Sequence, residues 1–209
     1  AKNYLLDNLC SKVTDGKILK YINRPTSKLI TSKLVNYPLT PNQISIAVFF
    51  ISVFSGLIIS IEGYFFLLLG ALLAQLSSIL DGCDGEIARL KLLESKFGEF
   101  FDRVLDRYSD LFILTGLTFH TYFIHKTLTV FFIGFIVVGG KIILSYTAYI
   151  SDSMVSGYNR FRVGRDLIIL IILIGALFNI PYITLVVLVF IINVEVCKRL
   201  WILKDKLNY

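Results

Sequence analysis

The sequence contains two acidic motifs that decide how the chain must fold, DGCDGEIAR at residues 81–89 and GEFFDRVLD at residues 98–106. In a helix, side chains three or four residues apart lie on the same face. The residues that would share a face are Asp81, Asp84, Gly85 and Ala88 in the first motif and Gly98, Asp102 and Asp106 in the second. Both motifs adjoin long apolar stretches, where a carboxylate is costly and usually functional. The sequence therefore predicts two acidic helix faces that meet beside or within a membrane.

Composition excludes an ordinary soluble domain. Hydrophobic residues make up 56% of the 209 positions, and several apolar runs approach the length that crosses a bilayer. No basic patch is interleaved with aromatic residues, so we expect no nucleic-acid partner. The 3 cysteines have no spacing typical of a disulfide framework or a zinc site. No signal peptide is visible, and we expect a processed product or the membrane part of a longer protein.

The apolar runs predict an all-α polytopic membrane protein with six transmembrane helices. Thr40-Pro41 is a typical helix start, because an N-cap residue is followed by proline at the first helical position. The expected spans are Ile44–Ile61, Tyr64–Leu80 with a continuation to Arg89, Gly98–Phe123, Leu128–Ile150, Leu167–Phe178 and Tyr182–Leu203. Residues 37–209 would form this six-helix domain.

Residues 1–36 would precede it as a basic, amphipathic juxtamembrane segment at the membrane interface. Pro25 is expected to break this segment into two pieces, because proline removes a backbone donor. The alternative is a basic linker without a site.

The distribution of Lys and Arg predicts the orientation. One side of the membrane receives the N-terminal segment, the connection at 89–96, the loop at 160–165 and the C-terminus, whereas the other side receives little more than Lys126. By the positive-inside rule, the rich side is cytosolic. The aspartates would then lie just inside the cytosolic face of the cell membrane.

Carboxylates crowded into a partly dehydrated pocket repel one another unless a cation compensates them. Oxygen-only ligands favour Mg²⁺ or Mn²⁺, as one or two ions. The alternative is that the aspartates pair with Arg89, Arg103 and Arg107 and only hold two helices together. Arg89 could grip a phosphate or serve as a positive-inside anchor. A metal, an arginine and an open cleft together suggest phosphoryl chemistry.

The order Asp81, Asp84-Gly85, Ala88-Arg89, Gly98, Asp102 and Asp106 resembles, at every position, the signature of the CDP-alcohol phosphotransferase family of membrane enzymes. The resemblance implies transfer of a substituted phosphate from a CDP-alcohol donor to an acceptor hydroxyl, with release of CMP. It implies metal ligands at Asp81, Asp84 and Asp102, and a general base at Asp106 that also touches a second metal. It also implies a homodimer.

For the nucleotide, the resemblance implies cytidine near Gly85 and Ala88, and the diphosphate on the metals and Arg89. Asn42 resembles a Pro-Asn pair common in the family and would touch the nucleotide, although it could be a simple polar residue at a helix start. Histidine is the usual alternative base, but His120 lies about 21 Å beyond Asp106 on the same predicted helix, and His125 lies farther still. A carboxylate is therefore the expected base.

Cations elsewhere in the chain suggest which acceptor is used. Lys141 is an intramembrane cation that needs a partner, and Arg160, Arg162 and Arg165 crowd the start of the next span. Together they could bind an acceptor that carries a phosphate; alternatively the arginines only anchor the topology. This arrangement resembles the subgroup that uses inositol phosphate or a similar sugar phosphate, including di-inositol-phosphate and archaetidylinositol-phosphate synthases. The stretch at 15–25 is similar to members fused to an upstream cytidylyltransferase.

Two other functions are consistent with an acidic cluster in a membrane. An aspartate-rich membrane prenyltransferase also uses metal and diphosphate, but Gly85, Ala88 and Arg89 do not suit it. A cation transporter or channel would use the acids as an ion path. The acids cluster at the cytosolic end instead of along a full pathway, which disfavours transport.

Overall fold

The computed structural model describes residues 23–154 and 163–207, and every regular element in these two ranges is a helix. The helices are α2 (Arg24–Leu34), α3 (Pro41–Ile59), α4 (Tyr64–Leu90), α5 (Lys96–His125), α6 (Leu128–Met154), α7 (Arg165–Leu177) and α8 (Pro181–Leu207). The predicted all-α class is confirmed for the described chain, and the helix that carries the first motif continues unbroken through Arg89.

Local sequence explains where the helices begin. Thr40 and Gln43 form a capping box at the start of α3, with the Thr40 hydroxyl accepting from the Gln43 amide N–H at 3.4 Å and the Gln43 side chain accepting from the Thr40 N–H at 3.0 Å. Gly63 precedes α4 with a φ of 119°, which favours glycine. Pro25 lies in the first turn of α2, a position where its missing N–H costs no helical hydrogen bond. The predicted break of the N-terminal segment stays a prediction, because residues 1–22 lie outside the described ranges.

Three of the described helices are long and apolar enough to cross a membrane. These are α3, α4 and the Leu128–Ser151 part of α6. Helix α7 has only 13 residues, and α5 carries several charged side chains in its first half. Length and composition therefore identify three candidate spans within the described ranges.

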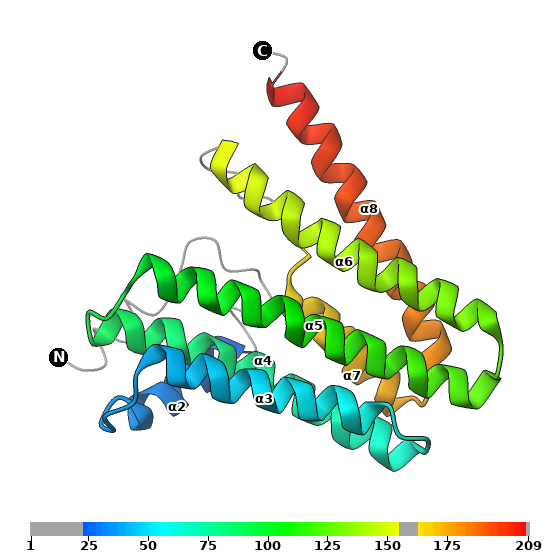
Figure 1. Ribbon diagram of the computed structural model, residues 1–209, viewed down its shortest axis with the longest axis horizontal. Coiled ribbons are helices and arrows are strands. Elements are labelled where there is room, and N and C mark those ends of the chain that lie inside the picture. The colour runs from blue at the N-terminus through cyan, green and yellow to red at the C-terminus, as the bar shows by residue number, and fades with distance from the viewer. Residues whose placement is uncertain (1–22, 155–162, 208–209) are drawn as a thin grey trace.

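Helix α3 packs along both α4 and α5, and these three helices lie together in the lower part of Figure 1. Helix α7 packs on α4, α6 packs on α5, and α8 packs on α6 and α7. Figure 1 shows α6 and α8 diverging from the other helices toward the C-terminal end of α8. Helix α2 lies against the end of α4 that carries the first motif.

The apolar residues of α2 do not all face outward. Ile30 and Leu34 pack against a small core formed by Ile44, Val48, Cys83 and Ile87 of α3 and α4. Leu29, in contrast, is 69% exposed. Helix α2 is therefore docked on the bundle, and only part of its apolar surface is available to a membrane interface.

Glycines let α3 and α5 cross closely. A Cβ atom added at Gly116 would lie against the backbone carbonyl of Gly56, and one added at Gly56 would lie 2.5 Å from the Phe112 carbonyl oxygen. Gly134 and Gly140 also face neighbouring helices of the same chain, Gly134 at Thr118 and Gly140 at Ile192 and Asn193. Nothing lies within 4 Å of a Cβ added at Gly139.

We expect Gly116→Ala to destabilise the protein by about 1–3 kcal/mol, because the added methyl meets backbone that cannot move aside. Gly139→Ala is the matched control and should be neutral or stabilising by up to about 1 kcal/mol, since alanine favours helix and the site is open. Thermal unfolding in detergent measures both. Equal midpoints for the two variants would show that α3 and α5 do not cross closely at Gly56 and Gly116.

Candidate active site

Helices α4 and α5 bring three carboxylates together. Asp81 of α4 and Asp102 and Asp106 of α5 each offer an oxygen atom, and these oxygens lie within 4.8 Å of one another. The two acidic faces predicted from the sequence therefore meet. A donor set of carboxylate oxygens fits Mg²⁺ or Mn²⁺ better than a soft metal.

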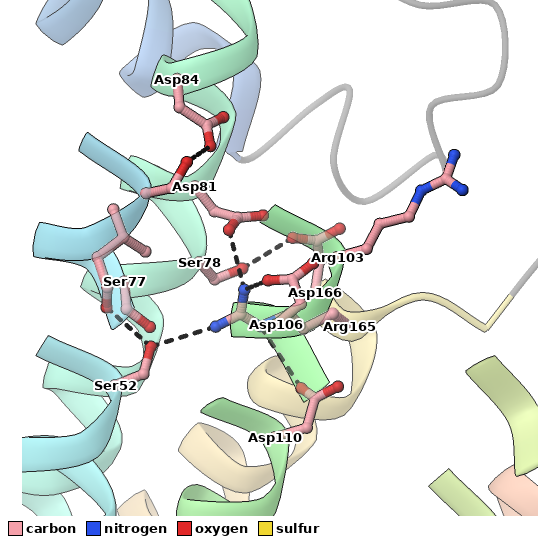
Figure 2. Close-up of polar contacts among 12 residues, drawn as sticks. Ser52, Ser77, Ser78, Asp81, Asp84, Arg103, Asp106, Asp110, Arg165 and Asp166 are labelled. Atoms are coloured by element: carbon pink, nitrogen blue, oxygen red, sulfur yellow. Dashed lines mark hydrogen bonds and ion pairs between the residues drawn. The ribbon is translucent and has the colours of Figure 1, made fainter. Parts of the chain in front are cut away.

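Asp84 extends this group toward the end of α4 (Figure 2). Its carboxylate is buried, accepts a hydrogen bond of 2.5 Å from the Ser45 hydroxyl of α3, and accepts another of 2.5 Å from the Gly85 N–H. We call Asp81, Asp84, Asp102 and Asp106 the acidic cluster. Three helices, α3, α4 and α5, fix its geometry.

Arg165, the first residue of α7, inserts its guanidinium into the acidic cluster (Figure 2). The Arg165 Nη1 donates to Asp81 Oδ1 at 2.9 Å and also pairs with Asp106 Oδ1. The Nη2 donates to the Ser52 hydroxyl at 3.2 Å. Only 9% of the side chain is exposed. Arg165 supplies positive charge to these partly buried carboxylates, and it would share Asp81 and Asp106 with any bound cation.

From the sequence, pairing of the acids with Arg89, Arg103 and Arg107 was the alternative to metal binding, and Arg165 was a candidate to bind the acceptor's phosphate. Arg107 does approach the acids, 3.6 Å from Asp106 and 3.8 Å from Asp110. Arg103 pairs with the exposed Glu99 at 2.5 Å, and its guanidinium points away from the acidic cluster (Figure 2). Of Arg103, Arg107 and Arg165, it is therefore Arg165 that makes the most contacts to the acids. Its partners are distant in the chain, so the spacing of residues in the sequence could not predict them.

Lys141, predicted to need a partner, has one. Its ammonium lies 2.9 Å from Asp110 Oδ2, and both side chains are buried. The other oxygen of Asp110 lies 3.5 Å from Arg165 Nε. Asp110 therefore links Lys141 to Arg165 beside the acidic cluster. Arg160 and Arg162, the remaining candidates for acceptor phosphate, lie outside the described residues.

The candidate nucleotide residues lie at the same end of the bundle. A Cβ at Gly85 would meet the Arg89 guanidinium at 3.4 Å, so this arginine lies over the glycine on α4. The Asn42 side-chain oxygen lies 3.2 Å from a Cβ built on Gly98, which places the start of α3 beside the start of α5. Ala88 is half-buried one turn beyond Asp84. These residues flank the acidic cluster from α3, α4 and α5.

Both histidines lie far from the acids. His120 Nδ1 is 2.8 Å from the carbonyl oxygen of Ile61, in the turn between α3 and α4. The His125 ring lies 5.1 Å from the Tyr182 ring at the start of α8. Neither can reach a substrate at the acidic cluster, as expected from the sequence.

A set of buried polar residues behind the acidic cluster was not predicted from the sequence. Glu86, inside the first motif, accepts hydrogen bonds from Ser27 and Thr31 of α2. Asp166, next to Arg165, accepts from Asn23 and Ser78. The sequence does contain a signal for this set, because Asn23, Ser27 and Thr31 recur every four residues, but apolar and basic residues dominate the pattern of the segment.

A family model for CDP-alcohol phosphatidyltransferases matches residues 38–198, which is well over half of the chain. The chain therefore belongs to the CDP-alcohol phosphatidyltransferase family. The match contains both acidic motifs and all of α3 to α7.

Relatives extend this result. The chain is 42% identical over 120 residues to the bifunctional IPC transferase and DIPP synthase of Aquifex aeolicus, covering 57% of this chain and 27% of that protein. A protein of the same name from Rubrobacter xylanophilus is 32% identical over 194 residues, covering 91% and 43%. The archaetidylinositol phosphate synthase of Pyrococcus horikoshii is 28% identical over 165 residues, covering 78% and 82%. The chain thus spans less than half of these two bifunctional relatives.

Solved structures share the fold. The phosphatidylinositol phosphate synthase of Mycobacterium tuberculosis, crystallised with CDP-DAG bound, superposes with a TM-score of 0.70 at 22% identity, covering 84% of this chain and 92% of that one. Its complex with manganese and citrate gives a TM-score of 0.68, with coverages of 83% and 87%. At this level of identity the likeness establishes a common helical architecture.

We expect Mn²⁺ or Mg²⁺ to stabilise the folded protein, by about 2.7 kcal/mol when the cation is at a hundred times its dissociation constant. Asp102→Asn should lose this effect, because it removes a carboxylate from the centre of the acidic cluster. Glu99→Gln is the control, since Glu99 is exposed and its carboxylate pairs with Arg103, away from the cluster. Thermal unfolding with added cation or EDTA measures the shift. A shift of equal size in wild type and Asp102→Asn would place the cation elsewhere.

Proposed function

We propose that the acidic cluster catalyses transfer of a substituted phosphate group from a CDP-alcohol to an acceptor hydroxyl, with release of CMP. The observation that carries this proposal is the convergence of Asp81, Asp102 and Asp106 within 4.8 Å, in a chain that belongs to the CDP-alcohol phosphatidyltransferase family. The class is a metal-dependent transferase of phospholipid or inositol-phosphate-type biosynthesis.

The four carboxylates of the acidic cluster would hold one or two Mg²⁺ or Mn²⁺ ions. The fold is shared with a synthase crystallised with manganese, and the oxygen donors here suit either ion. Bound cations would neutralise the diphosphate of the donor and the negative charge that develops on the leaving CMP. The hydrogen bond from the Ser45 hydroxyl would keep the Asp84 carboxylate oriented for cation binding. Asp81 would bind a cation from its position on α4, opposite α5.

Asp106 is the proposed general base. It would accept the proton of the acceptor hydroxyl while that oxygen forms a bond to the phosphorus bearing the alcohol group. The bond between this phosphorus and the bridging oxygen breaks, and CMP leaves with that oxygen and its electron pair. Asp106 suits the role by its position, because its carboxylate oxygen lies within 4.8 Å of those of Asp81 and Asp102, where the bound cations would hold the reacting groups.

The donor would lie at the end of the bundle where α3 and α5 begin and α4 ends. Cytidine would lie near Gly85 and Ala88 on α4, where the Arg89 guanidinium lies over Gly85 in this structure. Arg89 would bind the diphosphate, and Asn42 would contact the nucleotide. The solved relative with CDP-DAG has the same fold, which supports a CDP-linked donor.

Two alternatives remain testable, an aspartate-rich prenyltransferase and a cation transporter. Family membership favours a CDP-alcohol donor over a prenyl diphosphate. The acids are also paired with Arg165 at one end of the bundle instead of following a path through it.

We expect Asp106→Asn to lower kcat for CMP release by about 10²–10⁴-fold, because asparagine keeps the shape but cannot take the proton. The variant should fold with an almost unchanged midpoint, whereas Glu99→Gln should keep wild-type turnover. Release of radiolabelled CMP from CDP-alcohols, with prenyl diphosphates as alternative donors, is the measurement. Full turnover by Asp106→Asn would remove Asp106 as the base.

The acceptor is proposed to carry a phosphate, as an inositol phosphate does. Lys141 and Arg165 lie on either side of Asp110, so two cations flank one carboxylate beside the acidic cluster. Arg160 and Arg162 would be further cations for the same phosphate. The names of the relatives, DIPP synthase and archaetidylinositol phosphate synthase, support an acceptor of the inositol-phosphate type.

We expect inositol phosphate to be a better acceptor than inositol by at least about 10²-fold in kcat/KM, since each charge-assisted contact to phosphate contributes about 1.5–3 kcal/mol. Arg165→Lys should raise the KM for the phosphorylated acceptor, because lysine lacks the bidentate fork of arginine. Lys126→Met, at the opposite end of α5, is the control. Product analysis with both acceptors decides, and a preference for unphosphorylated inositol would refute this pocket.

Topology and assembly complete the proposal. We propose that α3 to α8 form six spans in the cell membrane, that residues 1–36 form the juxtamembrane segment, and that the acidic cluster faces the cytosol. The chain would form a homodimer, as the family resemblance implies. A fused or associated cytidylyltransferase is supported by the bifunctional names of relatives longer than this chain.

A further inference from the structure

We propose that a row of buried polar side chains on α2 positions the catalytic site from behind. The row consists of Asn23, Ser27 and Thr31, and we call it the α2 polar row. It would fix the rotation of α4 through Glu86 and the first turn of α7 through Asp166. The inference rests on the proposed function, because it assigns these residues to the same acidic cluster.

The α2 polar row is buried, whereas the polar face of an interfacial helix usually faces water. Its three members are spaced by four residues, so they lie on one face, and each is at most 1% exposed. On the outer side, Leu29 is 69% exposed. A helix that buries hydroxyl and amide groups while exposing leucine is held by directional bonds as well as by apolar contact. Such bonds specify one orientation.

The first anchor is Glu86. It is fully buried, and its two carboxylate oxygens accept hydrogen bonds of 2.8 Å from Ser27 and 2.7 Å from Thr31. Successive residues in a helix are rotated by about 100°, so Glu86 points away from Asp84 by about 200°. Asp84 is held by Ser45 of α3 on that opposite side. Helix α4 is therefore gripped on two faces, and its rotation determines where Asp84 and Asp81 point.

The second anchor is Asp166. Its Oδ1 accepts from Asn23 Nδ2 at 2.9 Å and from the Ser78 hydroxyl of α4 at 2.7 Å. The Asn23 oxygen accepts in turn from Gln75 at 3.2 Å, so both ends of the amide are engaged. Asp166 directly follows Arg165, and Figure 2 shows Ser78 and Asp166 beside the guanidinium. Asn23 thus joins α2, α4 and α7 at the residue next to Arg165.

These contacts lead to two predictions that would not follow if α2 only packed against the bundle. Loss of the Glu86 anchor should weaken cation binding, because it lets Asp81 and Asp84 rotate. Loss of the Asn23 anchor should alter use of the acceptor more than binding of the cation, because it acts through Arg165. A purely structural row would lower the unfolding midpoint and leave both properties unchanged in the folded fraction.

The experiment compares substitutions on the two faces of α2 in the full chain. Ser27→Ala removes one hydroxyl from Glu86, and Ser27→Ala with Thr31→Val removes both. Ser32→Ala is the matched control, because the Ser32 hydroxyl bonds to the Leu29 carbonyl within the same helix at 2.8 Å. Asn23→Ala tests the second anchor. Mn²⁺ affinity by EPR, kcat and KM for CMP release, and thermal unfolding are measured for each.

We expect kcat to fall by about 10–10²-fold in the double variant, since small misplacement of a catalytic group costs that much. Its Mn²⁺ dissociation constant should rise, and Ser27→Thr with Thr31→Ser, which keeps both hydroxyls, should restore both values. Asn23→Ala should raise the KM for the acceptor with Mn²⁺ affinity retained. Ser32→Ala should match wild type.

The proposal would be overturned if folded Ser27→Ala kept wild-type kcat and Mn²⁺ affinity and folded Asn23→Ala kept the wild-type KM for the acceptor, with only lower unfolding midpoints. If the double variant fails to fold, Ser27→Ala alone still decides, because Thr31 keeps one bond to Glu86. The proposed function fails separately: wild type would then release no CMP from any CDP-alcohol, while the Mn²⁺ comparison would still test the α2 polar row.

Discussion

Mutual repulsion among the carboxylates of the acidic cluster is the constraint on which the rest of this structure depends. Packed where α4 and α5 meet, these groups need positive charge close by, and burial makes that need greater than it would be in water. Arg165 of α7 supplies this positive charge. Asp110 pairs with Arg165 and also with Lys141 of α6. Ion pairing therefore brings α7 and α6 to the two acidic helices, and it leaves a site suited to cations and phosphates.

Such a site works only if its ligands are held still, and the fold provides rigid supports. The close crossing at Gly56 and Gly116 fixes α3 against α5, and Ser45 then reaches Asp84 from α3. Glu86 ties the opposite side of α4 to α2. Catalytic groups placed on packed helices and supported by buried hydrogen bonds keep the geometry that phosphoryl transfer needs.

Much of this could be predicted from sequence because it depends on local patterns. The capping box at Thr40, the turn at Gly63 and the acidic faces of α4 and α5 each follow from residues within a few positions of one another. The position of Arg165 could not be predicted in this way, because its partners Asp81 and Asp106 are 84 and 59 residues away in the chain. The role of Glu86 could not be predicted for a related reason, since only the docking of α2 shows which side of α4 it faces. On α8, the buried Glu195–Arg199 pair has the local spacing of four residues, but the bond from Arg199 to the Leu144 carbonyl of α6 joins distant residues and could not be predicted.

The central claim is that the acidic cluster binds catalytic cations and that Arg165 shares its carboxylates. A crystal structure with Mn²⁺ and a CDP-alcohol, recorded at the manganese absorption edge, tests it most directly. The account predicts an anomalous peak among the oxygens of Asp81, Asp102 and Asp106, with the donor diphosphate against the ion and Arg165 still in contact with Asp81 or Asp106. A peak elsewhere, or a donor bound with Arg165 still paired to both aspartates and no ion between them, would contradict it.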